Sequence, residues 1–177
     1  GFFFDAFSLS RADFITCNVR GYEDAQDWWW WYLRHPREFI PPSQRLRSFN
    51  TVYRLSRSSL AFLHEALVSG WCGHHEVMLP TLLYHGGFII RDIGGRGKFT
   101  PPGMEDRFYT SSPPNHRGVL NSGTMRYRPS FWRVGSQKNK LYHPVKSWAL
   151  IIRDKVNYVL AIDWPLIKRR FFSKHPL

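Results

Sequence analysis

The residues best suited to metal chemistry lie close together near position 74. Cys72, His74 and His75 form a short cluster, and thiolate and imidazole groups are good zinc ligands. A structural zinc site usually closes a tetrahedron with two short-spaced pairs, and this sequence offers one pair without a matching second one. The His-Glu pair at 64–65 also lacks the second histidine of a helical H-E-x-x-H site. We therefore predict no metal and no cofactor, and interpret the cluster as a polar turn.

A glycine-rich basic loop at 94–98 is the second candidate for chemistry. Its sequence, Gly-Gly-Arg-Gly-Lys, combines consecutive backbone amides with cations, and this combination attracts anions. The loop departs from the P-loop pattern, because Asp92 replaces the first glycine and Phe99 stands where serine or threonine would bind Mg²⁺. We interpret it as a flexible basic loop that can touch phosphates. The chain also lacks a G-x-S-x-G nucleophile elbow, so we expect no catalytic residue and no enzyme activity.

The strongest functional signal is a run of cations and aromatic residues at 126–133. In an extended chain Arg126 and Arg128 fall on one side and alternate with aromatic positions. Arginine and lysine supply affinity by contacting phosphates, while aromatic rings stack on unpaired bases. A solvated loop is the competing interpretation of this run. The nucleic-acid or anion-binding residues that we predict are Arg107, Arg117, Arg126, Arg128, Arg133, Lys138, Lys140, Lys146, Arg45 and Arg47.

The charge of the chain is high and unevenly distributed. Its net charge is +12, from 25 Lys and Arg against 13 Asp and Glu, and its pI is about 10.2. No acidic residue lies between Asp106 and Asp154, whereas cations occur throughout that stretch. A protein surface usually mixes both signs, because like charges repel one another and destabilise the compact state. We therefore expect the stretch to meet a polyanionic partner outside the chain.

Aromatic residues are also unusually frequent, at 17% of the chain with eight Trp. Four of the tryptophans are consecutive, at 28–31, and four adjacent side chains cannot all point into one core. Large aromatic side chains are enriched at protein interfaces. The aromatic residues that we predict to face a partner are Trp28, Trp29, Trp30, Trp31, Tyr127, Phe131 and Trp132.

Other sequence features bear on the cellular compartment of the protein. Cys17 and Cys72 are too few for a disulfide framework, and we interpret them as free thiols in a reducing compartment, with a single bridge between them as the competing interpretation. No window of 18 uncharged apolar residues occurs, so we predict no membrane-spanning helix. The sequence starts at Gly1 rather than Met, which indicates a trimmed chain or a mature chain whose leader was removed.

The pattern of apolar residues predicts a mainly α fold with long irregular extensions. Its small helical core comprises helices near 45–69 and 146–163, and an extended Gly/Pro-rich basic arm completes it. A β-hairpin is the competing interpretation of the second helix, because its β-branched content is high. We divide the chain into an acidic and aromatic N-terminal segment (1–33), a helical core with an Arg-rich face (34–93), the basic arm (94–145), and a C-terminal helix with a basic-aromatic tail (146–177).

These features favour a non-enzymatic structural subunit of a large assembly. The leading hypothesis is an rRNA-binding mitochondrial ribosomal protein, whose partners are rRNA and neighbouring proteins. The alternative is a peripheral accessory subunit of an inner-membrane respiratory-chain or ATP synthase complex, in contact with anionic lipid such as cardiolipin and with membrane-complex subunits. Both hypotheses predict a mitochondrial location, in the matrix or at the matrix face of the inner membrane. Neither requires a small-molecule substrate.

Overall fold

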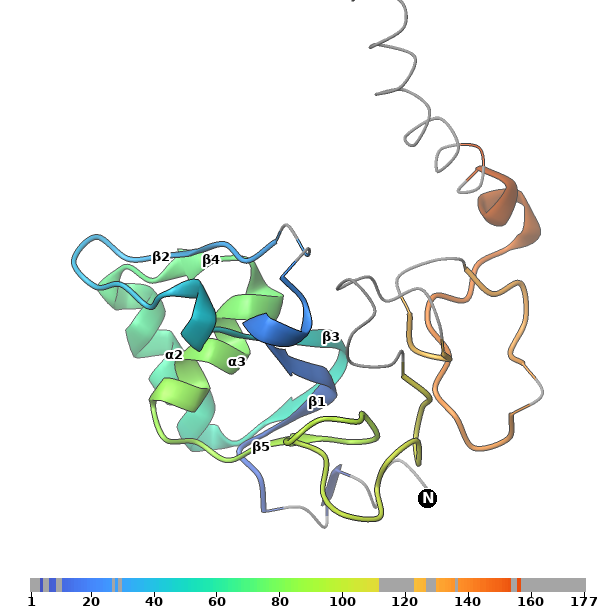
Figure 1. Cartoon of the computed structure of the whole chain (residues 1–177), viewed down its shortest axis with the longest axis horizontal. Coiled ribbons are helices and arrows are strands. Elements are labelled where there is room, and N and C mark those ends of the chain that lie inside the picture. The colour runs from blue at the N-terminus through green and yellow to red at the C-terminus, as the bar shows by residue number, and fades with distance from the viewer. Residues whose placement is uncertain are drawn as a thin grey trace, which may run out of the picture.

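The chain folds around a small mixed β-sheet in the computed structural model (Figure 1). Strand β1 (Phe14–Gly21) lies between β3 (Leu46–Leu55), to which it is antiparallel, and β5 (Ile90–Asp92), to which it is parallel. A second sheet pairs β2 (Leu33–Arg34) with β4 (Cys72–Gly73). The structure describes residues 4, 7–8, 11–26, 28, 30–111, 123–126, 130–135, 137–153 and 156.

Two helices cover one face of the three-stranded sheet (Figure 1). They are α2 (Arg57–Ser69) and α3 (His75–His85), and two short 3-10 turns, η1 (Tyr22–Asp24) and η2 (Pro42–Gln44), follow β1 and precede β3. The main core lies between sheet and helices and includes Phe14, Leu63 and Leu83. The opposite face of the sheet is covered by the chain after β5, with Phe108 and Tyr109 buried against Cys17 and Phe49 of the strands.

The prediction of a mainly α fold with a small helical core is wrong, because the structure is α/β. Within the first predicted helix, 45–69, residues 46–55 form β3 and only 57–69 are helical. The loose apolar stripe in 46–55 also suits a strand, since Thr51, Val52 and Tyr53 are residue types that pair well in sheets. Pairing with β1 decides between the two conformations.

The second predicted helix, 146–163, is described only in part. Residues 148–153 are helical, and most of its remaining residues lie outside those described. In the part of the chain that the structure describes, no helix is long and apolar enough to cross a membrane.

Helix α2 has the boundaries that its end residues dictate. The Ser56 hydroxyl accepts a hydrogen bond of 3.1 Å from the Ser59 N–H, which caps the first turn. Gly70 ends the helix in the left-handed conformation, with φ of 117°, where a glycine meets no steric penalty. The Ser56 hydroxyl also donates to the Asp13 carboxylate at 2.9 Å. This contact fixes the start of α2 to the start of β1.

Helix α3 forms despite Pro80 in its interior, where no separate helix was predicted. Val77, Leu82 and Leu83 are buried against the sheet, so tertiary packing outweighs the helix-breaking residue. The Thr81 hydroxyl donates to the Leu46 carbonyl and accepts from the Leu46 N–H, both at 2.9 Å. These two bonds anchor the helix to the start of β3.

The carboxylate of Asp92 joins the end of β5 to three other segments. It accepts hydrogen bonds from the N–H groups of Val19 (2.9 Å), Gly94 (3.0 Å) and Gly95 (2.8 Å), and from the Tyr109 hydroxyl (2.6 Å). Asp92 is buried, and burial raises its pKa while these hydrogen bonds act in the opposite direction. A buried carboxylate is tolerated when its lone pairs are satisfied in this way.

Replacing this carboxylate by an amide should destabilise the fold. Asp92→Asn places an NH₂ group against backbone N–H donors, so we expect a loss of about 3 kcal/mol in the free energy of unfolding. Denaturant unfolding of the full chain measures the loss. The control Glu105→Gln alters an exposed carboxylate and should change stability by less than about 0.5 kcal/mol. Equal stability of the two variants would contradict a supporting role for Asp92.

Candidate functional site

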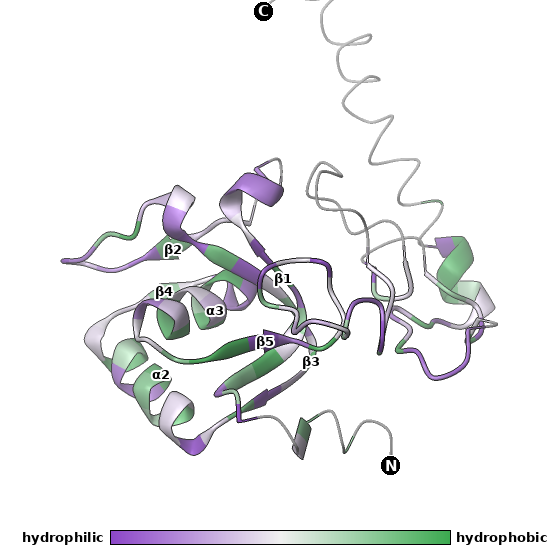
Figure 2. Cartoon of the chain, turned by 60° about the horizontal axis from the view of Figure 1, so that its bottom comes forward, coloured by the Kyte–Doolittle hydropathy of each residue, from purple (hydrophilic) through white to green (hydrophobic). Residues whose placement is uncertain are grey.

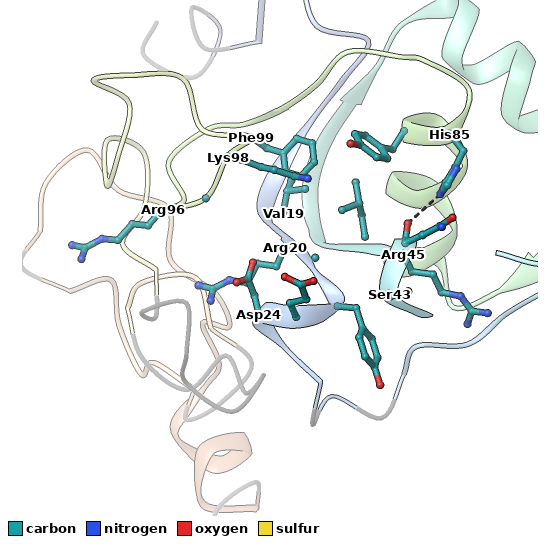
Figure 3. Close-up of a pocket in the computed structure, with 16 residues that line it drawn as sticks. Val19, Arg20, Asp24, Ser43, Arg45, His85, Arg96, Lys98 and Phe99 are labelled. Atoms are coloured by element: carbon teal, nitrogen blue, oxygen red, sulfur yellow. Dashed lines mark hydrogen bonds between the residues drawn. The ribbon is translucent and has the colours of Figure 1, made fainter. Parts of the chain in front are cut away.

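A cleft of about 590 Å³ opens at the end of β1, beside the loop that follows β5 (Figure 3). Because the two strands are parallel neighbours, their carboxyl ends meet at one edge of the sheet, and ligands of α/β proteins bind preferentially outside such ends. One wall is the end of β1 with η1, and another is the loop 96–99 that follows β5. We call this hollow the basic cleft. Its charged lining residues are Arg20, Glu23, Asp24, Arg45, Arg96 and Lys98, with His85 beside them.

The charge of this lining favours an anion. Four cationic side chains stand against two carboxylates, which leaves an excess of two positive charges before any contribution from His85. A concave site lined mainly by one sign of charge concentrates ligands of the opposite sign.

Two of the four cations are committed to structural contacts. The Arg45 guanidinium donates from Nε to the Ile40 carbonyl (2.8 Å) and from Nη1 to the Trp31 carbonyl, and in Figure 3 it points away from Arg20. Arg96 forms an ion pair with Asp106 and also points outward (Figure 3). Arg20 and Lys98 complete the cationic lining of the basic cleft.

Arg20 forms the inner end of the cleft. Its side chain is almost fully buried and lies beside Asp24 (Figure 3). Burial lowers the pKa of Arg20, and the acidic groups of Tyr109, Asp24 and Asp92 partly offset that effect. A buried guanidinium offers its planar donor array to an oxyanion with little competition from water.

Lys98 lies on an aromatic wall. Its ammonium nitrogen is 5.3 Å from the ring centroid of Tyr84 and 5.1 Å from that of Phe99. Such contacts hold the amine by cation–π attraction without neutralising its charge. The wall therefore offers a positive charge next to flat apolar surfaces.

The glycines that begin the 94–98 loop have a structural role. Their N–H groups donate to Asp92, and a Cβ on Gly95 would lie 2.4 Å from a carboxylate oxygen of Asp92. These amides are therefore turned toward an internal anion, and the loop reaches the cleft through Arg96, Gly97, Lys98 and Phe99.

A second arginine lies behind the cleft. Arg47 of β3 pairs directly with Arg20 of β1, so the two side chains project from neighbouring positions of the sheet. Burial and then repulsion by Arg20 lower the pKa of Arg47 to about 10, while Glu76 and Asp24 act in the opposite direction. The Arg47 Nε atom is buried and has no hydrogen-bond partner among the described residues. This part of the sheet is short of negative charge.

Glu76, in the first turn of α3, is a carboxyl group that titrates in the neutral range. Burial raises its pKa to about 7, although the Asn50 backbone hydrogen bond and the charge of Arg47 lower it. A carboxyl with such a pKa can accept and release a proton at physiological pH. Because Arg47 interacts with Glu76 and also with the cleft residues Arg20 and Asp24, the protonation of Glu76 is coupled to the charge of the basic cleft.

The Cys72, His74 and His75 cluster, which we interpreted as a polar turn, meets the tryptophan run beside Glu76. His74 contacts the rings of Trp28 and Trp30, at centroid distances of 5.4 and 5.3 Å, and burial followed by the charge of His75 lowers its pKa. Cys72 is exposed. No three His, Cys, Asp or Glu side chains come together as a possible metal site within the described residues.

The structure disperses the other residues predicted to bind a partner. Trp28 and Trp31 pack against the core, whereas Trp30 is half-exposed. Arg45 lines the basic cleft, and Arg47 is buried in β3 rather than exposed on a helix. Four predicted residues, Trp29, Arg117, Tyr127 and Arg128, lie outside the described residues.

The predicted cations after Asp106 mostly contact uncharged groups. The Arg126 guanidinium lies 3.8 Å from the centroid of Phe131, and Arg107 lies 5.6 Å from that of Phe108. The Lys140 ammonium donates to the carbonyls of residues 106 and 107. Lys138 and Arg133 are exposed, and the backbone N–H of Lys146 donates a hydrogen bond to the Phe131 carbonyl.

Sequence reasoning missed Arg20, Asp24 and Glu76 as site residues. A strand followed by a short polar turn would have indicated the first two, but β1 was not recognised as a strand.

Comparisons with protein-family models, curated proteins and solved structures give no match to this chain.

The pKa of Glu76 makes stability depend on pH in a predictable direction. Its folded pKa, about 7, lies above the unfolded value near 4.5, so its contribution is fully present below pH 4.5 and is lost as the pH rises through 7. Glu76→Gln removes this loss, and the variant should exceed the parent chain in stability by roughly 2 kcal/mol at pH 8, with near-equality at pH 4.5.

Denaturant unfolding of both chains across this pH range tests the expectation. Glu65→Gln, an exposed carboxylate on α2, is the matched control and should leave the pH profile of the parent unchanged. A difference between Glu76→Gln and the parent that stays constant from pH 4.5 to pH 8 would show that Glu76 has an ordinary pKa.

Proposed function

We propose that this chain binds a phosphorylated ligand in the basic cleft. The observation that carries the proposal is the convergence of Arg20 and Lys98, from segments almost eighty residues apart, on one hollow at the carboxyl ends of β1 and β5. Phosphate is the anion that suits this pair, because a guanidinium binds two of its oxygens in a fork and an ammonium adds a point charge.

The size and the walls of the cleft narrow the class of ligand. A volume of about 590 Å³ lies within the range of sites for cofactor-sized molecules and is too small for a nucleic-acid duplex. Tyr84 and Phe99 place aromatic rings beside Lys98, where a planar group joined to the phosphate can stack. A nucleotide, free or within a single strand of RNA, has both parts.

The hypotheses drawn from the sequence stand alongside this proposal as predictions. In the ribosomal hypothesis the phosphate that enters the basic cleft belongs to rRNA. In the respiratory-complex hypothesis it comes from another source. The non-enzymatic role and the mitochondrial location likewise remain predictions. The correction of the fold removes the helical core from these hypotheses but leaves the charge imbalance on which they were built.

Calorimetric titration of the full chain with pyrophosphate, ATP and a short single-stranded RNA tests the proposal. Lys98→Gln should weaken binding about tenfold and flatten its dependence on salt, because one phosphate contact is lost. Arg96→Gln is the matched control: it makes the same charge change in the same loop, but its side chain points outward to Asp106. That variant should retain affinity within about twofold.

The pattern of results also identifies the source of the phosphate. Binding of ATP and RNA that is lost in Lys98→Gln supports a free nucleotide or a strand as ligand, whereas RNA binding alone supports a macromolecular partner. The proposal fails when no probe binds, or when the bound probe is equally sensitive to the two substitutions.

A further inference from the structure

An exposed group of apolar and basic side chains lies on residues 132–134, 148–153 and 156, apart from the residues that line the basic cleft. Two backbone hydrogen bonds, from Phe131 N–H to the Pro144 carbonyl (2.8 Å) and from Lys146 N–H to the Phe131 carbonyl (2.9 Å), hold the two segments together. Trp132 is thereby placed beside Trp148, with ring centroids 5.3 Å apart. We call this group the aromatic–basic patch, and its members are Trp132, Arg133, Val134, Trp148, Ile152 and Arg153.

The 148–153 helix turns an apolar face to the outside. Ile151 is buried, whereas Trp148 and Ile152, one turn apart, are about half exposed at 55% and 48%. Figure 2 shows this helix coloured largely as hydrophobic and lying away from the labelled helices and strands. Val156 continues the same face, since it follows Ile152 by four residues and is exposed to a similar degree. Soluble proteins rarely leave two adjacent tryptophans and aliphatic side chains in water without a partner.

The described charged side chains of this patch, Arg133 and Arg153, are both cationic. The Arg133 guanidinium lies 4.5 Å from the ring centroid of Trp132, and Arg153 ends the described turn of helix after Ile152. The sequence has no carboxylate from 107 to 153, and Asp154 and Lys155, next along the chain, lie outside the described residues, so a surface that covers the described patch meets two cations. The complementary partner is therefore apolar at the centre and negatively charged at the rim.

We propose that the aromatic–basic patch docks on an anionic lipid surface. Tryptophan favours the layer between head groups and acyl chains, aliphatic residues on one helix face enter the acyl boundary, and arginine pairs with lipid phosphates. Unpaired RNA bases would stack on Trp132 and Trp148 but would leave the aliphatic face of Ile152 and Val156 in water. A lipid surface can cover both the tryptophan rings and the aliphatic side chains of the patch, whereas RNA covers only the rings.

Co-sedimentation of the full chain with vesicles tests this proposal. Binding to phosphatidylcholine vesicles that contain phosphatidylglycerol should exceed binding to pure phosphatidylcholine and should fall as salt is added. The double variant Trp132→Ala/Trp148→Ala should bind anionic vesicles at least about tenfold more weakly, while the corresponding double Phe variant retains most of the affinity. Phe39→Ala, which truncates another exposed aromatic side chain, should bind as the parent does.

Two further measurements separate lipid docking from a loss of folding and test the role of the arginines. Denaturant unfolding should give equal stability for parent and variants, because the substituted rings are exposed; a loss of vesicle binding with intact folding then supports lipid docking. Arg133→Gln/Arg153→Gln should abolish the preference for anionic vesicles. The proposal is overturned when the parent does not bind anionic vesicles, when the tryptophan variant binds them as the parent does, or when that variant loses binding to single-stranded RNA alone.

Discussion

The carboxylate of Asp92 determines the shape of the edge of the sheet on which the basic cleft is built. It accepts hydrogen bonds from Val19, which precedes Arg20, and from Gly95, which precedes Arg96. Both main walls of the cleft are therefore hydrogen-bonded to the same buried carboxylate. The Tyr109 hydroxyl also donates to this carboxylate, from the segment that covers the opposite face of the sheet. Burying a carboxylate is costly, and the hydrogen bonds of four donors offset that cost only when all segments are in place. The position of Arg20 relative to the 96–99 loop thus depends on the assembled core.

Two neighbouring arginines lie next to this anchor. Arg20 and Arg47 are paired across β1 and β3, and their mutual repulsion adds to the effect of burial on the pKa of Arg47. Asp24 and Glu76 supply negative charge, but burial holds the pKa of Glu76 at about 7, so its charge is incomplete at neutral pH. An oxyanion in the cleft would favour the protonated form of Glu76, because the anion then takes over part of its electrostatic role. Ligand binding and proton uptake are coupled in this proposal.

The sequence predicted the elements whose ends carry local signals and missed those stabilised by long-range packing. Leu60, Leu63 and Leu67 recur at helical spacing before Gly70, and this part of the predicted helix 45–69 is helical, as α2. Strand β1 lacks the alternation of a half-buried strand because both of its faces are covered, and α3 was not predicted as a separate helix. The 94–98 loop was recognised from its glycines and cations. Arg20 could be indicated only by recognising β1 as a strand, and the parallel pairing of β1 with β5 then brings that strand next to the segment that leads into the loop.

The sequence-based argument from charge depends on what the cations after Asp106 contact. Arg126 and Arg133 lie on aromatic rings, and Lys140 donates to backbone carbonyls. Rings and carbonyls orient a cation but do not cancel its charge, so the stretch keeps its attraction for anions although it is attached to an α/β core. The basic cleft is concave and suits single phosphate groups, whereas the aromatic–basic patch suits a surface. Together the two proposals imply a chain that holds a phosphorylated ligand while it rests on an anionic membrane.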